Sequence, residues 1–542
     1  MRNWFERVKK IKFLEVITSG FLLYIISIYI KQAFRVDTSS AFTPFVDDAF
    51  IHLRFIHHFA QGNGFVWNIG ETPVEGFTSF LYVVFLGLFE RLGGTPIHIL
   101  PFIGVGSTIL IFLMTLWLLE LLNPDHRAEN LVAVSMLGLS PQLRFWSFSG
   151  LEITFYTFLL VLTIVVFIGY RRGKYQPWLV GILFGILALV RPESLGLFVV
   201  TVVYDACYDL WERKLNTGRI ILLLLSFAVI FLPVLAWKWW YFGYPFPNTY
   251  YAKTGAGWIQ IAGGAAYVME SLKQIIKGSL IPVFLALLTF RWKINKDRLY
   301  LVVFLAALCG IVVLNGGDHF GYARFLVPGL PFIFALVAIG LSEITAQLPL
   351  LNKSVLSVVI FAMTFLAWNP YKSFINEDVV PMQIGKVANK EKLEFFNNWD
   401  AGFIIMGRTL NRIAEPTDTI AVVPIGAIGY YSRINVLDMV GLVDPVIAHE
   451  PFDMSYVSSW RPGHDKGDGA YILRKRPKYI QLVDLLSSMP YSKLLPSSEQ
   501  YKSIVEIWNS PEFLELYEFY PVEVEGGWYY NLYRLKTNQT SS

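Results

Sequence analysis

The chain has 542 residues, of which 54% are hydrophobic and only 16% are charged, whereas soluble domains carry about 25% charged residues. Long apolar runs separated by short polar stretches fill residues 1–369, which excludes a soluble protein and predicts a polytopic α-helical membrane protein. The net charge of +4 comes from basic residues in the loops, so it does not indicate a nucleic-acid partner.

The first apolar run, Phe13 to Ile30, follows a basic N-terminal segment and is not followed by a small-residue cleavage site. It is typical of an uncleaved membrane helix with a cytoplasmic N-terminus. Placing every basic loop in the cytoplasm gives about eleven crossings, and the run 131–141 is too short to be one of them. The expected crossings are 13–30, 76–90, 97–121, 151–169, 178–190, 193–204, 219–240, 279–290, 299–314, 325–346 and 354–369.

This path places the polar loops of the chain on the outer face of the cytoplasmic membrane, starting with a first outer loop at residues 31–75. Ionisable residues beside hydrocarbon are costly, so their grouping on one face indicates a functional site there. The loops concerned hold Asp47–Asp48, Ser149–Glu152, Arg191–Glu193, Pro245–Lys253 and Gly316–Arg324.

The composition changes near residue 370, where short apolar strands begin to alternate with amphipathic stretches and turns. We expect a helix over most of Lys392 to Glu415. Residues 1–369 are therefore predicted to form a transmembrane domain, and residues 370–542 a soluble extracytoplasmic α/β domain. The predicted strands of this domain are Thr419–Pro424, Tyr479–Val483 and Trp528–Leu535.

The acidic pair Asp47–Asp48 begins a helix-length stretch in the first outer loop. Asp48 and His52 are four residues apart, and Asp47 and Arg54 are seven apart, so a helix places each pair on one face. In one interpretation Asp47 only caps this helix and Asp48 complements its dipole. We favour the other interpretation, in which the pair supplies a catalytic carboxylate.

Two further motifs carry charge next to apolar helices. Asp318, His319 and Arg324 follow a Gly-Gly pair that lets the backbone approach a ligand closely, and arginine suits a phosphate; the alternative is a salt-bridged helix end. Arg191-Pro192-Glu193 interrupts an apolar stretch, and its alternative is an internally paired break between helices. The aromatic run 237–253 suits either a membrane interface or stacking on sugar rings.

In their order along the chain, these motifs resemble the GT-C glycosyltransferases. Within that class the chain is most similar to the terminal β-(1→2) arabinofuranosyltransferases of mycobacterial cell walls and their wider bacterial relatives. The matching segments are Asp47–Ile51, Gly62–Asn68, Glu75–Ser79, Ser149–Glu152, Arg191–Glu193, Pro247–Lys253, Gly316–Asp318, Arg324–Leu326, Ile428–Tyr431, Asp438–Pro445 and Pro462–Lys466.

The resemblance implies an enzyme that moves a sugar, arabinofuranose in the family named, from a polyprenyl-phosphate donor to a cell-envelope glycan. It implies that Asp47, with Asp48 close behind, is the catalytic carboxylate and that His319 is a catalytic histidine. A divalent cation at Asp47, Asp48 and Asp318 is compatible with the oxygen ligands that hard cations prefer, although the spacing does not require one. The residues expected to bind substrate are Arg54, Glu75, Glu152, Arg191, Glu193, Asn248, Tyr251, Lys253, Asp318, Arg324 and His464.

Two other functions stay open at the level of sequence. A transporter or flippase of polyprenyl-linked glycans would use the same basic and apolar residues, but it would need repeats or paired broken helices, and the sequence shows no inverted pattern. A non-catalytic, glycan-binding membrane scaffold differs from the enzyme only in its lack of activity.

Overall fold

The computed structural model describes residues 13–288, 295–346, 386–388, 394–396, 398–453, 455, 460–495 and 497–536. The chain forms two compact units. The first unit holds residues 1–36, 100–234 and 265–379, and the second holds 37–99, 235–264 and 380–542. The predicted domain boundary at residue 370 differs from this division, because two of the predicted outer loops belong to the same compact unit as the C-terminal residues.

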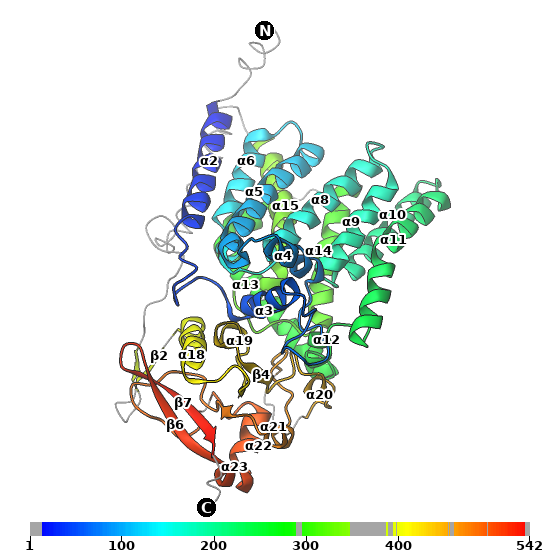
Figure 1. The fold of residues 1–542 in the computed structure, drawn as a ribbon. Helices are drawn as coiled ribbons and strands as arrows, with labels where there is room; N and C mark the ends of the chain where they lie inside the picture. The colour runs from blue at the N-terminus through cyan, green and yellow to red at the C-terminus, as the bar shows by residue number, and fades with distance from the viewer. Residues whose placement is uncertain are drawn as a thin grey trace, which may run out of the picture. The chain divides into compact units, whose positions relative to one another are not determined.

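The first unit is built from helices. Helix α6 (Arg127–Leu139) packs against α2 (Phe13–Ala33) and α15 (Leu330–Ala346), as Figure 1 shows. The other helices of this unit are α7 (Pro141–Phe148), α8 (Ile153–Arg171), α9 (Pro177–Val190), α10 (Ser194–Trp211), α14 (Lys296–Leu314), the 3-10 helix η1 (Arg324–Gly329), and most of α5 (Pro96–Leu122), α11 (Thr217–Phe242) and α13 (Trp258–Leu288).

Local sequence explains where several of these helices begin and end. Proline opens α7 and α9, at a position where its missing N–H has no intrahelical partner in any case. Helix α8 ends just before Gly173, which has a φ of 74° and donates its N–H to the carbonyl of Tyr170 at 2.8 Å. The basic end of α8 is held by α10, since Nη1 of Arg171 lies 2.5 Å from Asp205 and 2.7 Å from Asp209.

Among the described residues, seven helices are long and apolar enough to cross a membrane, so the chain is a multi-pass membrane protein. They agree with seven of the expected crossings, and α9 is a shorter apolar helix at an eighth. Helix α4 (Phe80–Arg91) has only 12 residues, so the expected crossing 76–90 is not among these spans. The expected crossing 354–369 lies outside the described residues, and 279–290 lies partly outside them. The seven are Glu15–Ala33, Pro96–Leu122, Ile153–Arg171, Ser194–Trp211, Thr217–Phe242, Lys296–Leu314 and Arg324–Glu343.

The second unit contains a five-stranded sheet with the order β4-β3-β5-β7-β6. Strands β3 (Thr419–Val422), β4 (Asn435–Asp438) and β5 (Tyr479–Ile480) run parallel, while β7 (Trp528–Leu535) is antiparallel to β5 and to β6 (Tyr517–Val524). The hairpin of β6 and β7 lies at the red end of the chain in Figure 1. Buried apolar side chains of the strands and of α21 (Gly469–Lys475) and α22 (Lys502–Trp508) form the core of this region.

Three predicted strands are confirmed as β3, β5 and β7. The predicted helix over Lys392–Glu415 is confirmed as α18 (Trp399–Ile413), but residues 394–396 form β2, which pairs with β1 (Lys386–Ala388). Strands β4 and β6 were not predicted. β6 contains Pro521, which cannot donate to a sheet ladder, and it is accommodated because β6 is an edge strand.

Three helices of the second unit position the acidic pair. Helix α3 (Asp47–Ala60) packs against α19 (Gly426–Ser432), and α19 packs against α18. Helix α19 follows directly from the loop after β3, at the carboxyl end of the parallel strands. The remaining short helices of this unit are α12 (Asn248–Ala252), α20 (Pro445–Ala448) and α23 (Pro511–Leu516).

Candidate active site

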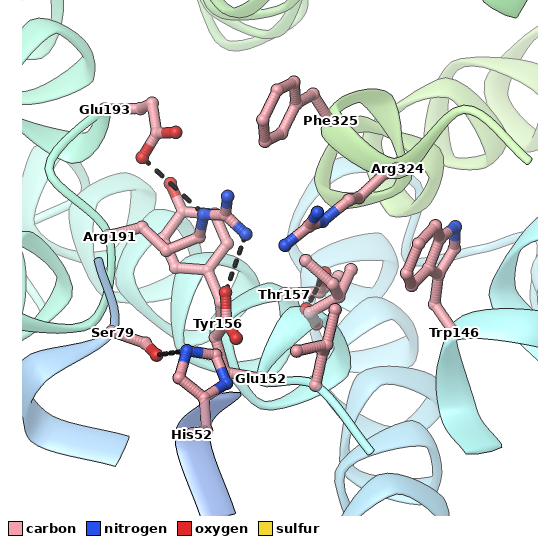
Figure 2. Close-up of polar contacts among 12 residues, drawn as sticks. His52, Ser79, Trp146, Glu152, Tyr156, Thr157, Arg191, Glu193, Arg324 and Phe325 are labelled. Carbon is pink, nitrogen blue, oxygen red and sulfur yellow. Dashed lines mark hydrogen bonds and ion pairs between the residues drawn. The ribbon is translucent and has the colours of Figure 1, made fainter. Parts of the chain in front are cut away.

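Two buried arginines of the first unit meet at one aromatic ring, that of Phe325. The guanidinium carbon of Arg191 lies 5.1 Å from the ring centroid and that of Arg324 lies 5.7 Å from it, and Figure 2 shows the two guanidinium groups pointing toward one another. Arg191 follows α9 directly and is 4% exposed, while Arg324 opens η1 and is 6% exposed. Like charges gathered away from water need anionic partners.

Carboxylates from three separate segments orient these arginines. Nη1 of Arg191 donates to Glu152 at 2.8 Å, and its Nε lies 3.6 Å from Glu193. Nη1 of Arg324 donates to Asp318 at 3.3 Å. The internal Arg191–Glu193 pairing that the sequence offered as an alternative is present, but the shorter contact of Arg191 is to Glu152, which precedes α8. The structure thus joins three motifs that lie in separate loops.

Aromatic side chains frame Arg324. Its guanidinium carbon lies 5.6 Å from the ring of Trp146 and 5.1 Å from that of Phe320. The indole N–H of Trp146 donates to the carbonyl of Tyr322 at 3.0 Å. Tyr322 and Ala323 both have positive φ, 55° and 51°, which costs about 1–3 kcal/mol each for residues other than glycine and is typical of functional sites. Trp146 was not singled out from the sequence, and Phe325 was included only as part of the matching segment Arg324–Leu326.

The loop before η1 brings Asp318 and His319 to the same cluster. Nδ1 of His319 lies 3.3 Å from the Asp318 carboxylate, and the His319 side chain is 34% exposed. A Cβ on Gly317, whose φ is 76°, would lie 2.6 Å from the Cβ of Tyr267, so the backbone here needs a glycine. The predicted set of Asp318, His319 and Arg324 is therefore assembled within the first unit.

The acidic pair lies in the second unit, in the first turn of α3. The interpretation in which Asp47 caps its own helix is wrong. The N-cap residue is Val46, and no side chain caps this helix start. Instead, the Asp47 carboxylate accepts the main-chain N–H groups of Gly426 at 3.0 Å and Ala427 at 2.7 Å. It thus sits at the N-terminus of α19, where the helix dipole favours an anion.

The surroundings of Asp47 shift its protonation toward neutral pH. Burial raises the pKa of Asp47 to about 7; the Ala427 N–H opposes this shift, and the carboxylates of Asp400 and Asp48 add to it. Burial also raises the pKa of Asp400 to about 6. A carboxylate that titrates near neutral pH is well matched to general-base work.

Buried carboxylates of the second unit predict a protein that is most stable in mild acid. Burial raises the pKa of Asp47 to about 7, that of Asp438 to about 7 and that of Asp484 to about 6, from an ordinary 3.8. The folded chain holds these protons more tightly than the unfolded chain, so the stability they contribute is complete below about pH 4 and is lost as pH rises toward 7. We expect the thermal unfolding midpoint in detergent to fall across this window; a rising midpoint would contradict it.

His52 and Arg54, the other predicted residues of α3, have local partners. Nε2 of His52 lies 3.1 Å from Oγ of Ser79, as Figure 2 shows. Arg54 is 5% exposed, and its guanidinium donates to four oxygens of the second unit. These are the carbonyl of Trp67, Oδ1 of Asn68 and the carbonyl of Ile434, each at 2.9 Å, and the carbonyl of Gly429. These contacts support a structural role for Arg54.

Replacing Arg54 is expected to destabilise the protein without touching the arginines of the first unit. Arg54→Met leaves several buried acceptors unsatisfied, each at a cost of about 1–3 kcal/mol. We expect a clearly lower thermal midpoint than for the wild type, measured on the whole chain in detergent. Arg127→Met is the control, because Arg127 is mostly exposed and its ion pair is with the half-exposed Glu120. Equal midpoints for the two variants would refute the structural role.

Two more predicted substrate residues hold the loops of the second unit together. Glu75 is buried and forms a 2.5 Å ion pair with Lys238, yet burial raises its pKa to about 7. The main-chain N–H of Asn248 donates to the Glu75 carbonyl at 2.9 Å. Nδ2 of Asn248 donates to the carbonyls of Gly441 at 2.9 Å and Leu442 at 3.1 Å. Asn248 thereby joins two motifs that are 193 residues apart.

The last three predicted residues lie in two motifs that contact one another. The ring centroid of Tyr251 lies 4.4 Å from that of His449, and Lys466 donates its ammonium to the Tyr251 carbonyl at 2.9 Å. A Cβ on Gly463 would lie 3.1 Å from Cε of Lys253. The neighbouring His464 holds its own loop, with Nδ1 3.1 Å from the carbonyl of Pro462.

The predicted cation ligands do not assemble into a metal site. Among the described residues, no group of three or more His, Cys, Asp or Glu side chains is arranged to hold a metal ion. Both oxygens of Asp47 already accept main-chain N–H groups, and Asp318 contacts Arg324 and His319. This donor set does not fit a three-carboxylate cation site, and no step below uses a metal.

Comparisons with known proteins bear on the fold. The family model that matches residues 394–533 is described as "Domain of unknown function (DUF8728)". No curated protein sequence matches the chain. Among solved structures, the chain is similar to ArnT from Cupriavidus metallidurans bound to undecaprenyl phosphate, with a TM-score of 0.52 and 13% identity over 78% of this chain and 86% of that chain.

Two other solved structures give lower scores. The Archaeoglobus fulgidus oligosaccharyltransferase has a TM-score of 0.49 and 13% identity, over 85% of this chain and 67% of that chain. Arabinofuranosyltransferase AftD from Mycobacteria has a TM-score of 0.47 and 15% identity, over 96% of this chain and 41% of that chain. The likeness to ArnT shows that the chain has the GT-C fold, the class that its ordered sequence motifs resemble.

Proposed function

We propose that the protein is an integral membrane glycosyltransferase that moves a sugar from a polyprenyl-phosphate donor to a cell-envelope glycan acceptor. The observation that carries the proposal is the pair of buried arginines, Arg191 and Arg324, at the ring of Phe325. A guanidinium presents a fork of N–H donors that matches phosphate oxygens. In support, the structurally similar ArnT was solved bound to undecaprenyl phosphate.

The arginines act on the leaving phosphate. When the bond between the sugar carbon and the phosphate oxygen breaks, negative charge builds on that oxygen. Preorganised cations are most effective at such a position, because they need no rearrangement as the charge develops. Arg324 and Arg191 fill this role, Glu152 and Asp318 keep the two guanidinium groups in place, and His319 donates a further hydrogen bond to the phosphate or to a sugar hydroxyl.

Asp47 acts on the acceptor. Its ionised carboxylate takes the proton of the acceptor hydroxyl while the new glycosidic bond forms and polyprenyl phosphate departs. The pKa of about 7 keeps a large share of Asp47 ionised near neutral pH while it remains basic enough to accept a proton. Asp48, next to it in the first turn of α3, shares this role or binds sugar hydroxyls.

The site is proposed to face outward. In this proposal the basic loops and the N-terminus lie in the cytoplasm, as the positive-inside rule predicts, and residues 370–542 lie outside it. Nucleotide sugars are absent from that side, so a lipid-linked donor supplies the activated sugar. The resemblance of the motifs makes arabinofuranose the first sugar to test.

The test is sugar transfer by the purified whole chain in detergent, supplied with a panel of polyprenyl-phosphate sugars and with glycan acceptors. We expect one donor to yield both a lengthened glycan and free polyprenyl phosphate, each detected by mass spectrometry. A well-folded chain that transfers no sugar from any donor would refute the enzyme. Movement of the lipid-linked sugar across proteoliposomes without transfer would establish the transporter instead.

A further inference from the structure

Two aspartates interlock the first outer loop with the C-terminal helices of the second unit. Oδ1 of Asp400 accepts the main-chain N–H of Asp47 at 2.9 Å, so a residue of α18 satisfies the start of α3. The Asp47 carboxylate in turn accepts the N–H groups of Gly426 and Ala427 at the start of α19. Each helix start is thus satisfied by a carboxylate that is more than three hundred and fifty residues away in the chain.

The contact between Asp47 and the start of α19 lies at the carboxyl end of β3. From β3 the chain goes first to β4 on one side and later to β5 on the other, so the strand order switches at β3. In open α/β sheets the carboxyl ends of the strands at such a switch point form the crevice where ligands bind. Here the main-chain N–H groups at the start of the helix after β3 donate to the Asp47 carboxylate and not to a bound ligand. A Cβ on Gly426 would lie 2.0 Å from the Asp47 main-chain oxygen, so this approach requires glycine.

Resting on the glycosyltransferase function proposed above, we propose that Asp400 is a positioning residue for the transfer reaction. It fixes the main chain of Asp47, and its negative charge acts on the Asp47 carboxylate. Asp400 lies in the first turn of α18, whose N-cap is Asn398. The local sequence at this point indicates a helix start and nothing about the contact with Asp47. The C-terminal part of the second unit is therefore part of the catalytic apparatus, because it holds the general base.

The charges around Asp47 give the direction of the effect. Asp400 and Asp48 both oppose ionisation of Asp47. Removing the charge of Asp400 therefore lowers the pKa of Asp47, so the base form of the enzyme persists to lower pH. Two cations lie close to α19, since the guanidinium carbon of Arg408 is 4.9 Å from the ring of Tyr431 and Arg54 donates to the carbonyl of Gly429. The titratable and charged groups on the three helices are Asp47, Asp48, His52, Arg54, His57 and His58 of α3, Asp400, Arg408 and Arg412 of α18, and Tyr430 and Tyr431 of α19.

Two substitutions separate the two parts of the role. Asp400→Asn keeps an oxygen that can accept the Asp47 N–H but removes the negative charge. We therefore expect the acid limb of the profile of kcat/KM against pH to move to lower pH. At high pH, kcat is expected to stay within a few-fold of the wild-type value. Asp400→Ala removes the acceptor, and we expect kcat to fall about 10–100-fold at every pH with KM for the donor unchanged.

The matched control is Asp468→Asn. Asp468 also satisfies a helix start, since it accepts the Tyr471 N–H at 2.7 Å at the start of α21, but it is not among the groups that shift Asp47. Its pH profile is expected to stay that of the wild type. An Asp400→Asn profile that also stays unchanged, in an enzyme that transfers sugar, would overturn the proposal.

Hydrogen exchange tests the interlock without any activity. We expect the main-chain amide of Asp47 to exchange faster in Asp400→Ala than in the wild type, whereas Asp468→Asn leaves it unchanged. A wild type that transfers no sugar but shows this exchange pattern would refute the proposed function and leave the contact standing. An Asp47 amide that exchanges at the wild-type rate in Asp400→Ala would overturn the positioning role itself.

Discussion

Asp47→Asn is expected to lower kcat for sugar transfer by about 10²–10⁴-fold, the usual contribution of a positioned general base. Asparagine has the size of aspartate and keeps one oxygen that can accept the N–H of Gly426 or Ala427. It has no carboxylate to take the acceptor's proton. The measurement is single-turnover transfer from the donor identified in the panel, with the thermal midpoint of the same preparation recorded beside it.

The paired measurement separates catalysis from structure. Losing one of the two hydrogen bonds costs about 0.5–1.5 kcal/mol, so a catalytic Asp47 leaves the midpoint little changed while transfer disappears. A midpoint that collapses together with transfer would make Asp47 a structural tie between α3 and α19. Full transfer by Asp47→Asn would remove it from the mechanism, and Asp48→Asn, prepared in parallel, would then be expected to carry the loss.

The sequence alone predicts much of this fold because its signals are local. Apolar runs long enough to cross a membrane identify the spans, and alternating apolar stretches identify β3, β5 and β7. Strand β4, Asn435–Asp438, is missed because it begins with an asparagine and ends with an aspartate, two residue types that are depleted in strands. The edge strand β6 is missed because it contains Pro521, which cannot donate to a sheet ladder.

The candidate site is harder to predict because its contacts are long-range. The motifs single out Arg191 and Arg324, but the shared ring of Phe325 and the Glu152 partner, 39 residues before Arg191, appear only once the helices pack. Arg54 is a further case. Its spacing from Asp47 predicts a shared helix face, but not that its guanidinium donates to the carbonyls of Trp67 and Ile434. Periodicity predicts which face of a helix a residue occupies, but it does not predict which distant oxygen accepts a hydrogen bond from its side chain.

Arg324→Gln is expected to lower kcat/KM for transfer by about 10²–10³-fold, as removal of a preorganised donor to a developing anion does. Glutamine cannot supply positive charge to the leaving phosphate. Arg324→Lys keeps the charge but lacks the planar fork, so an intermediate loss is expected. Arg127→Gln is the control, since Arg127 is mostly exposed on the same unit. Both kinetic constants are measured with the lipid donor varied.

A double variant distinguishes a lost phosphate contact from a disturbed fold. Arg324→Gln also takes away a counter-charge of the buried Asp318, and an uncompensated buried charge is destabilising in its own right. In Arg324→Gln with Asp318→Asn that charge is removed as well, so we expect the thermal midpoint to recover toward wild type while transfer stays low. Transfer that recovers together with the midpoint would make Arg324 a structural counter-ion and leave Arg191 as the phosphate ligand.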